Sequence, residues 1–449
     1  MTANGFPDRF SFGVATAAIQ IEGASDTRGE SIWDTFCRLP GRVAGGHTPA
    51  VACDHLHRYE EDLDLMASLG VDAYRFSISW PRVLPMGHGA PNRSGLDFYK
   101  RLVDGLHARG IEPVATLYHW DLPQALEDAG GWPARDTAER FAEYASLMFE
   151  ELGGGVRRWI THNEPWVTAF LGHAYGTKAP GRRDWREALR VAHHALLSHG
   201  LAVRAFRQIL APPASIGITL DFTPARPLTG SPGDREAAER WDLFRNRWFL
   251  DAVVRGAYPS ELLAWYESCL GPLELGGKED LEVISEPIDF LGCNYYSRAV
   301  VYGDPQARPL GLAHAVPEVP TTGMGWEVAP DSLFDLLLRI KREYGDIPIL
   351  ITENGSAYDD PVPTNGVVED PERLAYLRDH LEAVGRAAAS GVNVQGYFAW
   401  SLLDNFEWEH GYDKRFGIVY VDYETQRRIT KQSGLWYRDF IVQSRNGSP

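Results

Sequence analysis

Eight short apolar runs recur along the chain, each followed by a longer segment in which apolar residues are spaced as in a helix. Continuous apolar runs are typical of parallel strands covered on both faces, whereas antiparallel strands alternate apolar and polar residues. Eight strand–helix units predict an α/β protein of the (β/α)8 (TIM) barrel type. The alternative, a two-domain doubly wound fold, would need a linker that the sequence does not show. The runs span residues 10–17, 71–79, 113–119, 159–163, 215–221, 288–296, 347–353 and 394–403.

Helical spacing is clearest in residues 55–69, where apolar side chains at 56, 59, 63, 66 and 69 form one stripe that Gly70 ends. Residues 303–330 are rich in Pro and Gly, and we interpret them as a long loop rather than a domain boundary. We predict a single domain over residues 1–449, with long loops after the strands forming the active-site pocket. Further helices are predicted over residues 96–108, 138–152, 185–210, 332–344 and 371–390.

Composition excludes several classes of protein. The chain has 449 residues, and 44 Lys and Arg against 61 Asp and Glu leave a net charge of −17. This acidic balance repels polyanions, so we expect no nucleic-acid partner and no membrane partner. An apolar fraction of 44% is enough for a buried core and excludes a mainly disordered chain. Aromatic residues reach 12%, which fits either dense packing or the binding of sugar rings.

The cysteine pattern and the absence of targeting signals predict a cytoplasmic protein. Four cysteines stand at positions 37, 53, 269 and 293 without a C-x-x-C pair, which favours reduced thiols over a disulfide framework. The first residues, MTANGFPDRF, lack the basic and apolar regions of a signal peptide. No apolar stretch approaches the ~18 residues of a membrane span. The sequence does not predict the oligomeric state.

Two glutamates stand where catalytic residues of a barrel are expected, at the carboxyl ends of strands. Glu164 follows the fourth apolar run and Glu353 ends the seventh. A single strand-end glutamate is more often ion-paired or solvated than catalytic. Two of them, with polar and aromatic residues at the other strand ends, indicate the paired carboxylates of glycoside hydrolysis. Those accompanying residues are Arg75, His119, Trp120, Asn163, Asn294, Tyr296 and Trp400.

The segments THNEP around Glu164 and ITENG around Glu353 resemble the two signatures of family 1 of the glycoside hydrolases, the β-glucosidases. The similarity extends nearly end to end. The resemblance implies a (β/α)8 barrel that hydrolyses small-molecule β-glycosides with retention, without a cofactor and without a metal. It also rests on FSFGVATAAIQIEGA, SIWDTF, YRFSISWPR, LYHWDLPQAL, NRWFLD, FLGCNYYSR, MGWEVAP, YFAWSLLDNFEW and GYDKRFG.

The resemblance implies a role for each matching residue. Glu353 would be the nucleophile and Glu164 the acid/base, while Arg75 and Tyr296 would hold Glu353 ionised. Asn294, which stands beside Tyr296 in the sequence, would have a supporting role. Trp326 would face the leaving group, although loop packing alone also explains it. His119 taken alone would be an ordinary core histidine, and Glu407 and Trp408 taken alone could lie in a solvated loop. The residues implied to bind the sugar are Gln20, His119, Trp120, Asn163, Tyr296, Trp400, Glu407 and Trp408.

The sequence departs from the family pattern at three positions. Ile19 replaces a common aromatic residue, His162 replaces Phe or Leu before Asn-Glu-Pro, and Asp221 replaces a commoner Asn on the leaving-group side. These changes leave the leaving-group preference open, and His162 is expected to bear on the surroundings of Glu164. The pairs His55/His57 and His193/His194 are interpreted as ordinary helix residues, because neither spacing places both side chains on one helical face.

Three functions compete at this stage. The first is a β-glucosidase acting on unphosphorylated sugars. The second is a phospho-β-glucosidase, which Glu407 disfavours because a carboxylate repels a phosphate. The third is a barrel that binds sugars without catalysis, which the presence of both Glu164 and Glu353 disfavours. The preferred sugar is not predicted.

Overall fold

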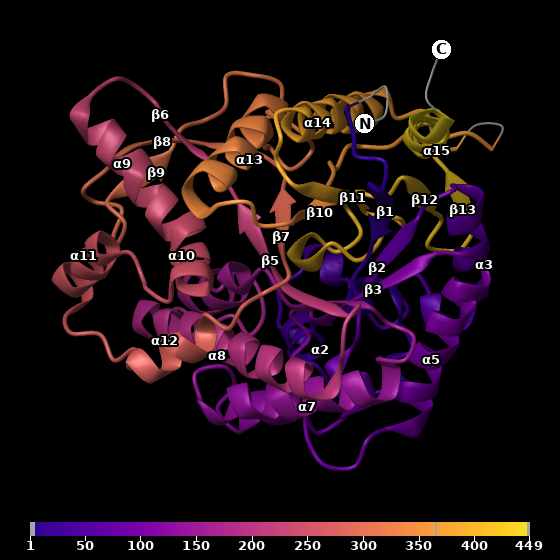
Figure 1. Ribbon diagram of the computed structural model, residues 1–449, viewed down its shortest axis with the longest axis horizontal. Helices are drawn as coiled ribbons and strands as arrows, with labels where there is room; N and C mark the ends of the chain where they lie inside the picture. The colour runs from indigo at the N-terminus through magenta and orange to yellow at the C-terminus, as the bar shows by residue number, and fades with distance from the viewer. Residues whose placement is uncertain (1–4, 364–365, 447–449) are drawn as a thin grey trace.

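The centre of the molecule is a closed barrel of eight parallel strands (Figure 1). The computed structural model describes residues 5–363 and 366–446. Each of the eight predicted runs forms one barrel strand, so the predicted fold class is confirmed. In the order in which they are neighbours around the barrel, the strands are β1 (Ser11–Ala15), β11 (Val394–Trp400), β10 (Ile349–Asn354), β7 (Phe290–Tyr295), β5 (Ser215–Phe222), β4 (Arg158–Asn163), β3 (Glu112–Tyr118) and β2 (Ala73–Ser77).

Packing on both faces explains why the strands read as continuous apolar runs. Along β3, Val114 belongs to a cluster that fills the barrel, and the next residue, Ala115, belongs to the larger cluster beneath the helices. Leu350 and Ile351 divide in the same way on β10. The apolar residues of these strands therefore meet apolar neighbours on both faces.

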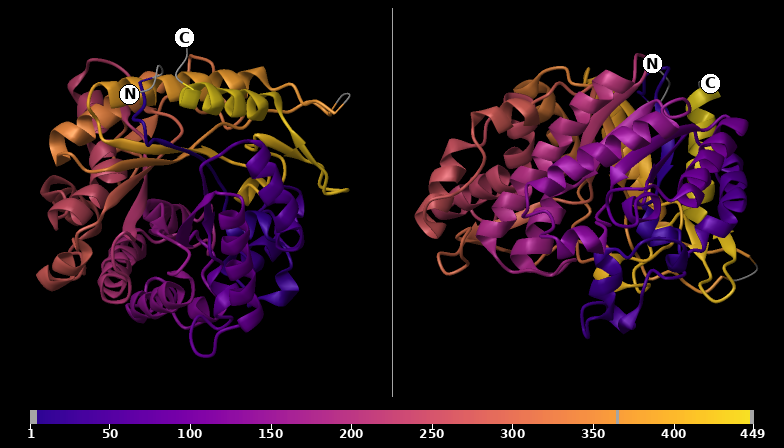
Figure 2. Two further views of the ribbon diagram at one scale, coloured as in Figure 1. Left: turned by 45° about the vertical axis from the view of Figure 1, so that its right-hand side comes forward. Right: turned by 90° about the horizontal axis from the view of Figure 1, so that it is seen from below.

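A layer of helices surrounds the strands, as Figure 2 shows from two further directions. The predicted helices are present, with boundaries that differ by at most three residues. The longest described helix, α8, begins where the Asp184 side chain accepts hydrogen bonds from the backbone N–H groups of Arg186 and Glu187. The helices of this layer include α3 (His55–Ser68), α5 (Arg93–Ala108), α7 (Asp136–Leu152), α8 (Trp185–Ile209), α13 (Pro330–Tyr344), α14 (Pro371–Ala389) and α15 (Gln432–Asn446).

The connection from β5 to β7 is longer and more structured than the sequence indicated. It contains the helical elements α9 (Pro232–Asp242), η4 (Leu243–Arg247), α10 (Trp248–Arg255), α11 (Ser260–Leu270) and α12 (Lys278–Ile284). The interpretation of residues 303–330 as a plain loop is wrong in part. They include β9 (Leu312–His314), which pairs with β8 (Ala299–Gly303), and β8 in turn pairs with β6 (Ala225–Pro227).

The remaining short elements lie in the connections between strands and helices. They are α1 (Ala18–Ile21), η1 (Ser25–Thr27), α2 (Ile32–Arg38), η2 (Ala44–Gly46), α4 (Trp80–Val83), α6 (Gln124–Asp128), η3 (Val167–Tyr175), η5 (Trp408–His410), β12 (Val419–Val421) and β13 (Arg428–Thr430). In the described chain, all four cysteines are free thiols. No helix among residues 5–363 and 366–446 combines the length and apolarity needed to cross a membrane. Residues 1–4, part of the segment in which we expect no signal peptide, lie outside the described residues.

A buried network of charges fastens the loop after β11 to the helical layer. Lys431, which directly precedes α15, is fully buried, and its Nζ lies 2.6 Å from Asp404 Oδ1 and also contacts Asp360. Asp404 belongs to the loop after β11 and is fully buried as well. Arg373 of α14 lies 2.8 Å from the second carboxylate, Asp360. The loop is therefore held by charges that cannot reach water.

We predict that Lys431→Met lowers the free energy of unfolding by about 2–3 kcal/mol, because Asp360 and Asp404 would lose the cation that they share and would keep only Arg373 and Arg415 as charged partners. Urea-induced unfolding followed by fluorescence measures the change. Lys278→Met is the matched control, since the Lys278 side chain is 89% exposed and its loss should change stability by less than about 0.5 kcal/mol. Equal effects of the two substitutions would contradict the prediction.

Candidate active site

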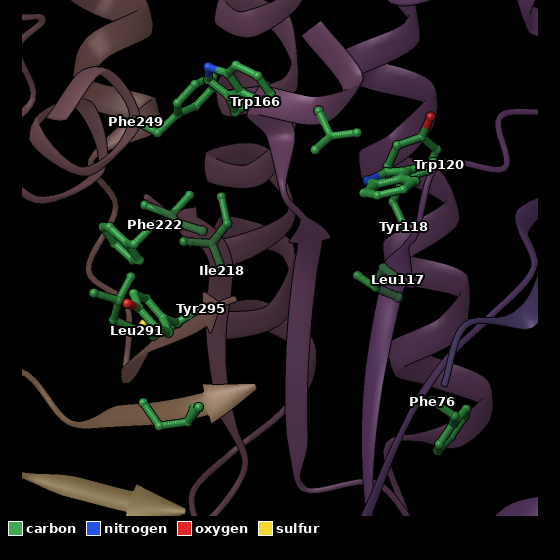
Figure 3. Close-up of a cluster of buried hydrophobic side chains, with 14 of the residues drawn as sticks. Phe76, Leu117, Tyr118, Trp120, Trp166, Ile218, Phe222, Phe249, Leu291 and Tyr295 are labelled. Atoms are coloured by element: carbon green, nitrogen blue, oxygen red, sulfur yellow. The ribbon is translucent and has the colours of Figure 1, made fainter. Parts of the chain in front are cut away.

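A cavity of about 440 Å³ lies among the carboxyl ends of the barrel strands and the loops that follow them. Three of the expected site residues, Gln20, Arg75 and Asn163, do not line it but lie behind those that do. In Figure 3, Trp120 and Trp166 lie in the upper part of the buried apolar cluster, beyond the carboxyl ends of their strands. The expected residues that line the cavity are His119, Trp120, Glu164, Asn294, Tyr296, Trp326, Glu353, Trp400, Glu407 and Trp408.

Glu353 is held by two partners that favour its charged form. It lies near the end of β10 and is only 3% exposed. Arg75 Nη1 of β2 lies 2.5 Å from its Oε1, and the Tyr296 hydroxyl donates to its Oε2 at 2.6 Å. With both oxygens engaged, the carboxyl group is fixed in direction.

Glu164 is placed by the turn that ends β4. Its backbone has a positive φ of 49°, which turns the chain sharply, and its N–H donates to the Thr219 carbonyl of β5 at 2.9 Å. The Asn294 amide donates to Glu164 Oε1 at 2.7 Å. Asn294, for which a supporting role was expected, lies against Glu164. It therefore helps to orient the second carboxyl of the cavity.

The surroundings of the two glutamates differ in charge. Burial raises the pKa of Glu164 well above its ordinary value, and the carboxyls of Asp221 and Glu353 raise that pKa further. Burial also raises the pKa of Glu353, but there the Arg75 guanidinium and the Tyr296 hydroxyl oppose the rise. Protonation therefore falls preferentially on Glu164, and the negative charge falls on Glu353.

Asn163 links the polar side chains behind the cavity. Its Oδ1 accepts hydrogen bonds from Arg75 Nη2 at 2.7 Å and from Asn294 Nδ2 at 3.0 Å. Its Nδ2 lies 3.0 Å from His119 Nε2. Burial and the charge of Arg75 lower the pKa of His119 well below its ordinary value, so the ring is neutral. The other ring nitrogen of His119 has no partner among the described residues, which leaves it available to a ligand.

Residues from opposite ends of the chain meet on another side of the cavity. Gln20 Nε2 donates to the Phe406 carbonyl at 2.8 Å and lies 3.4 Å from Glu407 Oε2. Burial raises the pKa of Glu407 to about 8, although the Lys178 ammonium opposes the rise. Trp400 and His119 stack with their ring centres 5.7 Å apart, which presents flat apolar surface beside these polar groups.

The opposite part of the cavity, which we call the outer half, is lined by Trp326, Asp221 and Arg245, which pairs with Asp221 and which sequence reasoning missed. Sequence reasoning also missed Lys178, which lines the cavity beside Trp120 and Trp408 and whose Nζ lies 2.6 Å from Glu409 Oε2. Arg245 directly precedes the NRWFLD segment, the one signal that could have drawn attention to it. Lys178 lies in a connection with no distinctive pattern.

His162 does not reach the cavity, so its expected bearing on the surroundings of Glu164 is corrected. Neighbouring residues of a strand point to opposite faces, and Asn163 occupies the inner one. His162 points into the helical layer, where Nε2 lies 2.7 Å from the Ser198 hydroxyl and Phe141 packs 4.5 Å from the ring. His55 contacts Asp62 at 2.7 Å, an ordinary helix contact. Within the described ranges, no three His, Cys, Asp or Glu side chains gather as metal ligands would.

A (β/α)8 barrel whose cavity is lined by two buried carboxyl groups and several indole rings defines a class of protein, the carbohydrate-cleaving hydrolases. Comparison with known proteins specifies the family. The model described as "Glycosyl hydrolase family 1" matches residues 2–446. This chain belongs to glycosyl hydrolase family 1.

Individual relatives agree with this assignment. "Beta-glucosidase A" of Acetivibrio thermocellus is 49% identical over 97% of this chain and 98% of its own length. The "Bifunctional beta-D-glucosidase/beta-D-fucosidase" of Bifidobacterium breve is 46% identical over 97% of this chain and 98% of its own. Among solved structures, the β-glucosidase from Thermotoga maritima in complex with glucoimidazole is 46% identical, with a TM-score of 0.95 over 98% of this chain and 100% of that one.

We predict that Glu353→Gln lowers the pKa of Glu164, because the substitution removes a negative charge that favours the protonated form of Glu164. Carbon-13 NMR titration of labelled glutamate measures the shift. Glu327→Gln is the control: Glu327 lines the same cavity but pairs with Arg298 at 2.7 Å, so its loss should have a smaller effect. A Glu164 titration unchanged by Glu353→Gln would argue against the coupling.

Proposed function

We propose that this protein is a retaining β-glucosidase that releases terminal non-reducing β-D-glucosyl residues from oligosaccharides and from aryl or alkyl β-glucosides. The observation that carries the proposal is the pair of buried carboxyls in one cavity, of which Glu353 is stabilised as an anion and Glu164 as an acid. The family assignment and the named activities of the relatives support it.

In the first step of the proposed reaction, a Glu353 oxygen attacks the anomeric carbon while the bond from that carbon to the leaving-group oxygen breaks. Glu164 gives its proton to the departing oxygen, so an alcohol leaves and a glycosyl ester of Glu353 remains. Arg75 and Tyr296 keep Glu353 charged and aimed before the attack.

In the second step, Glu164 is an anion and takes a proton from water as the water oxygen attacks the anomeric carbon. The ester bond to Glu353 breaks, and the sugar leaves with its original anomeric configuration. Asn294, which donates to Glu164 Oε1, stabilises this anionic form and limits how far the pKa of Glu164 is raised.

The sugar would lie between Trp400 and the polar side chains. Stacking on the indole of Trp400 would bury the apolar face of the ring, while His119 and Glu407 would face its outer hydroxyls and Gln20 would bind from behind Glu407. Asn163 would hydrogen-bond the 2-hydroxyl, exchanging its present contact with His119 for the sugar. Trp120, Tyr296 and Trp408 would complete this half of the cavity, and Trp326 would contact the leaving group.

The proposal extends to β-galactosides and β-fucosides. Glu407 and, behind it, Gln20 would be the partners of the 4-hydroxyl: the Glu407 carboxyl lines the cavity, and Gln20 Oε1 beside it has no partner among the described residues. Two adjacent partners suit an axial or an equatorial orientation. Fucose lacks the 6-hydroxyl, so it forfeits one contact without introducing a clash. The bifunctional relative from Bifidobacterium breve supports this range.

The phospho-β-glucosidase alternative is disfavoured by the charges near Glu407. Lys178 is a cation close to this place, but it is paired with Glu409, and a phosphate would face the carboxyls of both Glu407 and Glu409. The other alternative, a barrel that binds sugars without cleaving them, does not explain why the neighbours of Glu164 favour its neutral form while those of Glu353 favour its charged form.

The roles of the two glutamates predict opposite products when azide replaces the missing group. In Glu353→Ala, azide should take the place of the nucleophile and give the α-glycosyl azide from an aryl β-glucoside carrying a good leaving group. In Glu164→Ala, the glycosyl-enzyme should still form, and azide should attack it from the other face to give the β-azide. The proton coupling at the anomeric carbon distinguishes the two products, and exchanged or identical anomers would overturn the assignment.

We predict that Glu407→Ser lowers kcat/KM for an aryl β-glucoside roughly 100-fold, because the sugar hydroxyls lose a carboxyl group as hydrogen-bond partner. Hydrolysis of the matching 6-phospho-glucoside should improve relative to the glucoside, since a carboxyl group that repels phosphate in its ionised form has gone. Both substrates are measured with the same two proteins, so each serves as the control for the other. An unchanged glucoside rate would show that Glu407 does not contact the sugar.

A further inference from the structure

The ion pair between Asp221 and Arg245 lies in the outer half of the cavity and takes no part in the reaction steps proposed above. Asp221, near the end of β5, is 6% exposed, and its carboxylate pairs with Arg245 of η4. Both side chains line the cavity that contains Glu164 and Glu353. A buried ion pair at this place needs an explanation, because desolvating two charges is costly.

Backbone geometry couples Asp221 to Glu164. Asp221 lies opposite Asn294 in the register of β5 and β7, and the Asn294 amide donates to Glu164 Oε1 at 2.7 Å. The backbone N–H of Glu164 donates to Thr219, two residues before Asp221 on the same strand. Both residues are therefore held by β5 and β7. The charge of Asp221 acts electrostatically on Glu164.

Arg245 is held in place on the other side of this pair. Its guanidinium lies 3.6 Å from the ring centre of Trp166, the second residue after Glu164, and its Nε donates to the Thr223 hydroxyl at 3.3 Å. Trp166 is 6% exposed and packs edge-on against Phe244 of η4 at 5.4 Å. The cation is thus fixed between η4 and the segment that carries Glu164.

We propose that Asp221 and Arg245 are positioning residues for the acid/base chemistry: Asp221 keeps Glu164 in its proton-donating form, and Arg245 limits that effect. The inference rests on the proposed function, since it takes Glu164 as the acid/base. The arrangement has a physical basis, because a nearby anion favours the neutral form of a buried carboxyl and a nearby cation favours its charged form.

The other groups around Glu164 fit this division. Glu353 on β10 is a second anion, Asn294 on β7 is a neutral donor, and the Tyr296 hydroxyl is occupied by Glu353. Of the charged neighbours that act on the pKa of Glu164, Asp221 raises it most, Glu353 raises it less, and Arg245 lowers it. Burial raises the pKa of Asp221 itself to about 6, with Arg245 opposing the rise, so Asp221 is largely an anion at neutral pH.

The test is the pH dependence of kcat/KM for an aryl β-glucoside, whose alkaline limb reports the acid in the free enzyme. Asp221→Asn should move that limb to lower pH by about one unit, because an anion is lost and Arg245 is left unopposed. Adding Arg245→Gln to this variant should recover part of the shift. The expected order of the limbs, from high to low pH, is the unmodified protein, the double variant, and Asp221→Asn.

A purely structural ion pair would lower activity or thermal stability without moving the limb. Asp280→Asn is the matched control, because Asp280 pairs with Arg135 at 2.6 Å outside the cavity and its loss should leave the pH profile in place. If Asp221→Asn alone does not fold, the double variant carries the test, because its limb must lie below that of the unmodified protein. A limb unmoved by removing Asp221, or moved equally by Asp280→Asn, overturns the inference.

Glu164→Gln separates a failure of this inference from a failure of the proposed function. If Glu164 is the acid/base, this variant should lose the alkaline limb for an activated leaving group and should hardly cleave a poor one. A retained limb would refute the acid/base assignment itself. A limb that disappears in Glu164→Gln but does not move in Asp221→Asn would refute only the role of the ion pair.

Discussion

Arg75 places a guanidinium, which stays charged at any physiological pH, in the buried mouth of the barrel. Its hydrogen bonds reach Thr116 on β3, Asn163 on β4, and both Thr352 and Glu353 on β10. An unpaired charge at this depth would cost several kcal/mol, so each of these strands must bring its partner to the cation. The Arg75 contacts that tie β2 to β3, β4 and β10 therefore also aim the Glu353 carboxylate into the cavity.

Glu164 and Glu353 are both buried, but one is held in its neutral form and the other in its charged form. Both side chains are nearly inaccessible, and burial alone would push both toward the neutral form. What distinguishes them is the neighbours: a cation and a phenol at Glu353, and a second anion, Asp221, at Glu164. The two glutamates are chemically identical, and they differ in protonation state because different strands bring different charged neighbours to each of them.

The sequence predicted the eight strands and the main helices because a barrel covered on both faces leaves its apolar signal unbroken. It also located Glu164 and Glu353, since a glutamate at the end of an apolar run stands out. It could not locate Arg245 or Lys178, which come from connections without a strand end, or the partner of Asn294, which depends on rotamers. The expectation for His162 failed because alternate strand residues face opposite sides, a rule that the sequence alone already offered.

Gln20 and Glu407 are separated by 387 positions along the chain, yet their side chains lie next to each other at the edge of the site. They meet because β1 pairs with β11, the strand that closes the barrel. During synthesis on the ribosome, the early part of the site must wait for nearly the whole polypeptide before it gains its counterpart. Prematurely terminated chains would therefore carry the Glu164 segment without a complete pocket. Only a chain that has been translated beyond the last barrel strand can be catalytically active.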